Sequence, residues 1–402
     1  MKTLAHLLLF ALALSTFSCA EDSKKTLSGD KPAPTVSGSS SDTPTGEMPD
    51  CFLYTANVDK LLIREEPTQK SVKILGKVAK GSLLEGSGEA SGNKEMAVLS
   101  GREVESVFYK INVPGAEARQ GWVFGGALLP IYAGRKNAAP DQARLAQLSK
   151  TLASYKITQL ASGQKAWDYV SKNYSDVSGS LADAVFSLLE QHLNTMVFEG
   201  NFYTLTEREQ WADADYEQIH KGSFDMNSRP LTKQLAAAGM SLGSAEGMIF
   251  PTIDYKRLQS FFGNKLTAPM REYLQQITHE ALEPMYDDGG IVIPLEEVAN
   301  RAIFWEHFNK KYPYFLRKEE TGHYEHWMST ALLCGADNTP IFNYETKAIL
   351  DDYKNVWTSV IGKYPGSKLA ADTKTFTDLC TAEGWKVSPK VEAWMQARNQ
   401  LQ

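Results

Sequence analysis

The histidines and carboxylates beyond residue 50 are the first candidates for chemistry. His323 and His326 stand three residues apart, so a helix would present both imidazoles on one face, as metal ligands require. The pairs Glu217–His220 and Glu320–His323 have the Glu-x-x-His spacing of di-iron helical bundles. However, Gly322 places Glu320 before the helix, and no HExxH motif or matching second pair of carboxylates follows. We therefore expect hydrogen-bonded or surface histidines, among them His192, His279 and His307, and no metal.

Cofactor-binding patterns are missing. There is no phosphate-binding loop and no dinucleotide fingerprint. The Gly-rich stretch 239–247 lacks the lysine and preceding strand of a phosphate loop, which indicates a linker between helices. The acidic pairs 287–288 and 296–297 fit a turn or a helix start, where carboxylates favour solvent or the helix dipole. We expect no cofactor and no catalysis; the alternative is a cell-wall or metal-dependent enzyme with its site in the helical region.

The composition is globular. Of 402 residues, 43% are apolar and 22% charged, which excludes disorder for the chain as a whole and leaves room for two or three domains. The formal net charge is -6, and no run of five like charges occurs. This balance argues against nucleic acid as a partner.

The N-terminus reads as an export signal. Lys2 precedes an apolar run from Leu4 to Leu14 that is too short to span a bilayer. The run ends in the residues LSTFSC, and Ser18-Cys19 resembles the cleavage site of bacterial lipoprotein precursors. The resemblance implies a signal peptide at 1–18, lipidation of Cys19, and a cell-envelope protein held by lipid at the outer membrane, on its periplasmic or surface face. The alternative is an ordinary signal peptide cut near Ala20.

A tether follows the lipidated cysteine. Residues 19–50 contain no aromatic side chain and are rich in Ser, Thr, Gly and Pro. Such a segment buries too little apolar surface to offset its conformational entropy. As a flexible coil its ends lie roughly 30 Å apart, so it acts as a spacer between lipid and folded protein.

The remaining cysteines are Cys51, Cys334 and Cys380. Export permits disulfides, and Cys334 and Cys380 occupy similar places in two related helical segments, which makes them a candidate pair. Buried free thiols are the alternative. Neither cysteine has the Gly-rich context of a peptidoglycan peptidase.

Residues 51–132 have the pattern of a small β-barrel. Short runs of branched and aromatic residues alternate with Gly and Pro turns. The expected strands cover residues 52–58, 60–64, 71–78, 82–85, 104–113 and 121–123.

Three motifs in this region resemble bacterial SH3-like (SH3b) domains. They are LLIREEP at 61–67, ILGKVAKG at 74–81, and FYKI at 108–111 followed by GWV at 121–123. One departure is the stretch 86–101, which lengthens an internal loop. The resemblance implies a binding module, which in cell-wall enzymes docks on peptidoglycan peptides, with Tyr109, Trp122 and Arg64 as ligand-binding residues. The alternatives are a core role for Trp122 and a strand-end brace at Arg64.

Beyond a polar connector at 134–141, the apolar period changes from two to 3.6, which predicts an all-α domain at 141–402. A capping box at 180–183 opens one helix, and further helices are expected over 206–220, 267–283, 294–312, 343–363, 368–383 and 389–401. Trp305 and Tyr312 recur at the same spacing as Trp357 and Tyr364, and the turn after Tyr364 resembles that of tetratricopeptide-like helical hairpins. A generic helix-turn-helix explains the same spacing.

These patterns together predict an α+β multidomain chain, with a small SH3-like β-barrel followed by an all-α domain. We expect a lipid-anchored envelope protein that binds or scaffolds. Its expected partners are the membrane, through the N-terminal lipid, and either peptidoglycan or an envelope protein.

Overall fold

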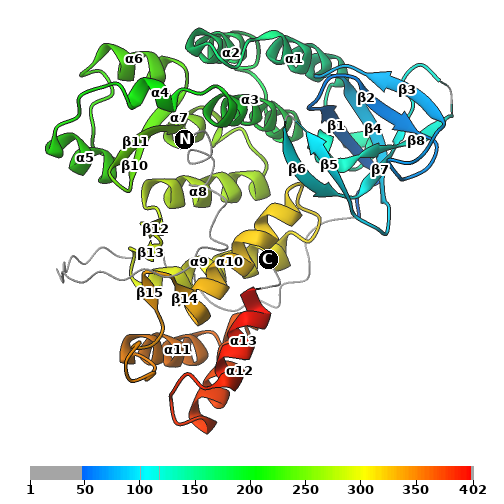
Figure 1. Ribbon diagram of the computed structural model, residues 1–402. Coiled ribbons are helices and arrows are strands. Elements are labelled where there is room, and N and C mark those ends of the chain that lie inside the picture. Colours follow the sequence, from blue (N-terminus) through cyan, green and yellow to red (C-terminus); the bar gives the residue numbers. More distant parts are fainter. Residues whose placement is uncertain (1–47, 100, 117, 400–402) are drawn as a thin grey trace.

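The computed structural model describes residues 48–99, 101–116 and 118–399. The expected signal peptide at 1–18, lipidated Cys19 and nearly all of the tether at 19–50 lie outside the described residues. The described chain is mixed α/β, with an N-terminal sheet and a mainly helical C-terminal region (Figure 1). No helix among its described residues is both long and apolar enough to cross a bilayer.

The N-terminal region is a seven-stranded antiparallel sheet in the order β3-β2-β8-β7-β4-β1-β9. Its strands are β1 (Cys51–Ala56), β2 (Leu61–Arg64), β3 (Ile74–Val78), β4 (Leu83–Ala90), β7 (Phe108–Asn112), β8 (Gln120–Phe124) and β9 (Leu128–Gly134). Branched and aromatic side chains at alternate positions suit these strands, because the pleat sends them to the apolar faces. Over the described residues the sheet ends at β3 and β9 without closing into a barrel.

A separate hairpin extends from this sheet. β5 (Glu95–Leu99) pairs with β6 (Arg102–Ser106), and the two form a sheet of their own. The expected single strand at 104–113 is therefore wrong, because Val107 interrupts it and separates β6 from β7. The expected long loop at 86–101 is largely strand, and β9 has no counterpart among the expected strands.

Helices pack against the N-terminal sheet, and the two regions share one continuous apolar core. α1 (Gln142–Ser154) packs against β4, and α3 (Gly179–Glu199) packs against β9. Four buried residues of the outer strands belong to the same apolar core as the helices, namely Cys51, Leu53, Ile131 and Tyr132. This contact gives edge strand β9 a helical cover in place of a closing strand.

The C-terminal region is not purely helical, in contrast to the all-α expectation. Its longer helices are α1, α2 (Leu160–Asn173), α3, α8 (Ala268–Leu282), α9 (Leu295–Lys311), α10 (Lys318–Cys334), α11 (Asp351–Lys363), α12 (Lys368–Ala382) and α13 (Pro389–Asn399). Shorter helices include α6 (Pro230–Ala237) and α7 (Tyr255–Phe262). Three hairpins interrupt them: β10 (Met240–Ala245) with β11 (Met248–Ile253), β12 (Tyr286–Asp287) with β13 (Gly290–Ile291), and β14 (Gly335–Ala336) with β15 (Thr339–Pro340). The stretch 239–247 is thus a strand and its turn, not a linker between helices, and Gly247 turns at φ +71°.

Proline marks both ends of α8 as expected, whereas two other expectations about helix ends are wrong. α8 has Pro269 in its first turn and stops before Pro284, as expected. The expected helix at 206–220 is instead two short helices, α4 (Tyr203–Thr206) and α5 (Asp213–His220). The expected capping box at 180–183 is also wrong: α3 starts at Gly179, and the Asp183 carboxylate accepts the backbone N–H and the hydroxyl of Thr267.

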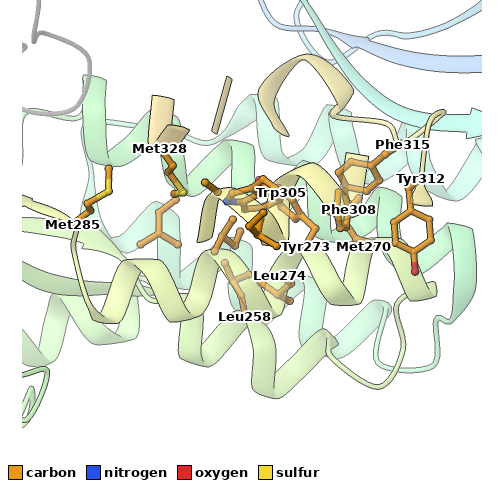
Figure 2. Close-up of a cluster of buried hydrophobic side chains, with 14 of the residues drawn as sticks. Leu258, Met270, Tyr273, Leu274, Met285, Trp305, Phe308, Tyr312, Phe315 and Met328 are labelled. Carbon is orange, nitrogen blue, oxygen red and sulfur yellow. The ribbon is translucent and has the colours of Figure 1, made fainter. Parts of the chain in front are cut away.

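The helical core is aromatic. Figure 2 shows Tyr273, Trp305, Phe308 and Phe315 gathered between α8, α9 and the turn before α10, and the Phe308 and Phe315 ring centroids are 4.9 Å apart. Trp305 and Trp357, the repeated tryptophans, are both fully buried. They lie in the first helix of two packed pairs, α9 with α10 and α11 with α12, with α11–α13 at the far end from α1 and α2 (Figure 1).

Candidate functional site

An open pocket lies beside Trp122 on the N-terminal sheet. Its volume is about 560 Å³. We call it the Trp122 pocket; its lining residues are Glu66, Pro67, Thr68, Ala90, Ser91, Gly92, Asn93, Glu95 and Trp122. These residues come from the loop after β2, the loop between β4 and β5, and strand β8. Segments far apart in sequence thus form one depression around an aromatic ring.

Hydrogen bonds hold the loop after β2 in place. Arg64 ends β2 opposite Trp122, and its Nη1 donates to the Ser71 carbonyl at 3.1 Å. The Gln69 backbone N–H donates to Glu95 Oε2 at 2.9 Å, which ties this loop to β5. Arg64 does not line the pocket, and its hydrogen bond to Ser71 agrees with the alternative of a strand-end brace.

The two aromatic residues expected to bind ligand together lie apart. Strand pairing sets Trp122 opposite Lys110 and Tyr109 opposite Val123. Adjacent positions on a strand face opposite sides, so Trp122 and Tyr109 project from different faces of the sheet. Tyr109 instead stacks on Tyr54, with ring centroids 5.6 Å apart, and burial raises its pKa.

Trp122 lies between the core of the sheet and the surface. Its side chain is half-buried, and Lys110 Nζ lies 5.3 Å from its ring centroid. The Lys110 ammonium is also 2.9 Å from the Glu89 carboxylate. Trp122 therefore both packs against the apolar core of the sheet and lines the pocket.

The pocket wall carries negative charge. Its lining includes the carboxylates of Glu66 and Glu95 and no lysine or arginine. The pKa of Glu95 lies below its ordinary value, first because its carboxylate accepts the Gln69 backbone N–H and then because it is bonded to the Thr68 side chain. No sequence pattern marks either glutamate as a ligand-binding residue. Glu66 lies within the motif at 61–67, and the lengthened stretch at 86–101 supplies Glu95.

A histidine–carboxylate cluster in the helical region was also missed. His279, Glu283 and Glu297 place ligand atoms within 4.8 Å of one another, at the end of α8 and the start of α9. However, buried Arg301 donates to both carboxylates, at 2.7 Å to Glu283 and 2.8 Å to Glu297. A guanidinium already neutralises these oxygens and repels a cation, so the arrangement is an ion-pair network rather than a metal centre.

The histidines with metal-ligand spacing do not converge. His323 is exposed, whereas His326 is half-buried with its Nε2 3.3 Å from the Thr330 hydroxyl. Glu320 accepts hydrogen bonds from Tyr273 and Tyr324. Further along the chain, Glu217 pairs with Lys221 on the surface of α5, while His220 is exposed.

Deeper in the helical region, Glu190 of α3 and Arg317 form a buried ion pair with 2.5 Å between Oε2 and Nη2. Tyr255 donates to the other oxygen of Glu190 at 3.2 Å, and Arg317 donates to the Tyr273 hydroxyl at 2.9 Å. Burial raises the pKa of Glu190, while the carboxylate keeps the pKa of Arg317 above its usual range. Glu190 and Arg317 both have partners within the protein, so the cluster has the features of a structural contact. We call this cluster of Glu190, Arg317, Tyr255 and Tyr273 the structural joint.

The expected disulfide is not formed. Cys334 and Cys380 are free thiols, as is Cys51. Cys380 lies on α12 and is fully buried in the core of the helical region. Cys334 is the last residue of α10 and directly precedes β14. Burial raises the pKa of the Cys334 thiol to about 12 and that of Cys380 to about 11, so both stay protonated at neutral pH.

Comparison with known proteins adds no guide to these sites. No family model, curated protein or solved structure matches the chain. The assignment of function therefore depends on the geometry of the chain's own residues. By that measure the Trp122 pocket is an open site with an aromatic wall and carboxylates, whereas the carboxylates of the two charged clusters in the helical region are already paired with Arg301 and Arg317.

Proposed function

We propose that this chain is a cell-envelope binding protein, anchored by lipid on Cys19, whose N-terminal sheet is an SH3-like module that docks on peptidoglycan. The Trp122 pocket takes an extended peptide segment of the wall. One observation carries the proposal: an open pocket of about 560 Å³ with a half-buried tryptophan in its wall.

The chemistry of the pocket favours a peptide. A tryptophan face offers a flat contact surface at low entropic cost. Asn93 adds a side-chain amide that can hydrogen-bond a ligand backbone, and Gly92 lets a ligand approach closely, while the Ser91 hydroxyl holds the loop by bonds to the Asn93 carbonyl and the Phe108 N–H. Extended peptides combine apolar surface with regularly spaced amides, which matches this lining.

The SH3-like motifs support the same assignment. Arg64 ends β2 and Trp122 lies in β8, two strands paired at these residues, so motifs 61–67 and 121–123 meet beside the pocket. The open sheet differs from a closed SH3 barrel, and α3 covers the strand where closure would occur. The module is therefore proposed as an opened relative that shares its core with the helices.

The helical region would serve as the scaffold. Its core joins that of β1 and β9, which fixes the sheet relative to α1 and α3. A rigid platform at the end of a long tether would hold the pocket toward the wall and leave the distant α11–α13 free for an envelope partner. We propose no reaction for this region.

Cosedimentation with purified peptidoglycan tests the proposal. The chain from residue 20 onward is used, because the sheet shares its core with the helices and a fragment ending near residue 135 would expose that core. We expect the parent protein to pellet with the wall, and Trp122→Ala to weaken retention roughly 10-fold, as for an aromatic anchor at an interface.

Trp327→Ala is the matched control. Trp327 is also partly exposed, but it lies on α10 against Tyr286, with ring centroids 5.0 Å apart. Its replacement should leave retention unchanged, and circular dichroism should show both variants folded. If the parent protein does not pellet, or if Trp122→Ala in folded form pellets as well as the parent, the proposal fails.

A further inference from the structure

The Trp122 pocket combines a negative wall with an aromatic face. From this combination we infer that it selects stem peptides with a free primary amine, and that the ammonium group lies between Glu66, Glu95 and the Trp122 ring. This inference rests on the proposed docking to peptidoglycan. It adds a ligand class and assigns a role to two residues, Glu66 of the motif at 61–67 and Glu95, which lies outside the SH3-like motifs.

The two carboxylates differ in how they are held. Glu95 accepts the Gln69 N–H, which fixes its position and favours its ionised form. The Glu66 backbone N–H donates to the Ser71 hydroxyl, whereas its carboxylate has no hydrogen-bond or ion-pair partner among the described residues. One carboxylate is therefore pre-positioned and the other is free to close on a cation.

Nearby cations do not occupy these carboxylates. Arg64 donates to the Ser71 carbonyl, and Lys110 is paired with Glu89. The two hydrogen bonds from the loop, and not Lys70 or Arg64, are the largest causes of the lowered pKa of Glu95. None of these three side chains lines the pocket, so its interior keeps a net negative charge.

The Trp122 ring already accepts one ammonium group. Lys110 Nζ stands 5.3 Å from the ring centroid, a distance at which the ring quadrupole attracts a cation. A ligand amine that reached the ring from the pocket side would gain the same attraction together with that of the carboxylates. An amide in its place would carry no charge and would lose both.

This chemistry separates two states of the wall. The diamino acid of a stem peptide has a free side-chain amine when the stem is uncrosslinked, and an amide when it is crosslinked. The pocket should therefore favour uncrosslinked stems. Amine selection would direct the protein to parts of the wall that remain open to crosslinking.

Acetylated peptidoglycan provides the test, because acetylation converts every free amine to a neutral amide. We expect the parent protein to bind acetylated wall at least 5-fold more weakly than untreated wall. The variant Glu66→Gln/Glu95→Gln should bind both forms alike and at the weaker level. Glutamine keeps an oxygen that can accept the Gln69 N–H, so the loop should stay folded.

Glu103→Gln is the matched control for charge. Glu103 lies exposed on β6, away from the pocket lining, and its replacement should preserve the preference for free amines. If the parent binds both walls equally but Trp122→Ala still abolishes binding, the amine inference is overturned and the docking proposal stands. If the parent binds neither wall, the docking proposal itself fails.

Discussion

The helical region and the Trp122 pocket differ in whether their charged side chains are paired. In the helical region, Arg317 and Arg301 are buried, and each is matched by carboxylates within 2.8 Å. In the pocket, Glu66 and Glu95 face solvent and bind no cationic side chain. Buried charge must be neutralised locally, because desolvation is costly, whereas surface charge can stay available for a ligand.

This difference shows which clusters are suited to function. Tyr273 and Arg317, whose pKa values are raised well above their usual ranges, lie in the buried cluster around Glu190. Those shifts come from burial beside partners that already satisfy them. The Trp122 pocket holds few groups with a shifted pKa but is open to solvent, so it is its accessibility that supports the proposal that it binds a ligand.

Removal of Arg317 should give the largest effect and tests whether the helical charges are structural. Arg317→Met leaves Glu190 buried without its cation, so we expect a loss of about 3–5 kcal/mol in the free energy of unfolding. Urea denaturation followed by circular dichroism measures it. The double variant Glu190→Gln/Arg317→Met should recover part of that loss, because the orphaned charge is gone.

The matching control is Arg208→Met. Arg208 is exposed near the end of α4, and its replacement should change stability by less than about 0.5 kcal/mol. A small effect at Arg317, equal to that at Arg208, would contradict the structural joint and reopen this cluster as a functional site.

A pH effect of intermediate size is expected at His192 of α3. Burial, with a smaller contribution from Lys80, lowers the pKa of His192 from 6.5 to about 4, and its Nε2 has no hydrogen-bond partner within the described structure. The unfolded chain therefore binds a proton at higher pH than the folded chain. Stability from this group is complete above pH 6.5 and is lost as the pH falls toward 4, by about 3 kcal/mol at most.

His192→Leu isolates this effect. Asp183, whose burial raises its pKa to about 6, titrates in the opposite sense, so the difference between parent and variant is the useful quantity. We expect urea denaturation to show the parent losing more stability than His192→Leu between pH 6.5 and 4. Exposed His307, replaced by leucine, should show no such difference; equal pH profiles for the parent and His192→Leu would refute the prediction.

The smallest expected effect concerns the thiols. Because Cys334 and Cys380 are free, a reductant should shift the thermal midpoint by less than about 1 °C. A disulfide between them would close a long loop and contribute roughly 4 kcal/mol, which a reductant would remove. Thiol titration of the denatured, unreduced chain from residue 20 onward should find all of its cysteines reactive.

Much of the fold follows from local sequence signals. Pro269, Pro284 and Pro294 mark helix ends, because proline lacks the N–H that a helix interior needs. The alternation of apolar residues also indicates most strands of the N-terminal sheet. These features depend on residues close in sequence, so one chain is enough to show them.

The remainder depends on tertiary contacts. β9 is stabilised by β1 and α3, and nothing within 128–134 distinguishes an edge strand from a loop. Asp183 has the spacing of a helix cap but is buried against Thr267, far away in the chain. In the site, Trp122 was identified by its motif, whereas Glu66 and Glu95 become neighbours only through the folded loops.

Hydrogen–deuterium exchange with a soluble, amine-bearing stem peptide tests most directly whether the Trp122 pocket is the binding site. If it is, the peptide should slow exchange in residues 65–72, 90–96 and 120–124, which surround the pocket. The helices from α7 to α13 should show no change. Protection confined to the helical region, or none around the pocket at a peptide concentration that saturates binding, would contradict the assignment of the pocket as the docking site.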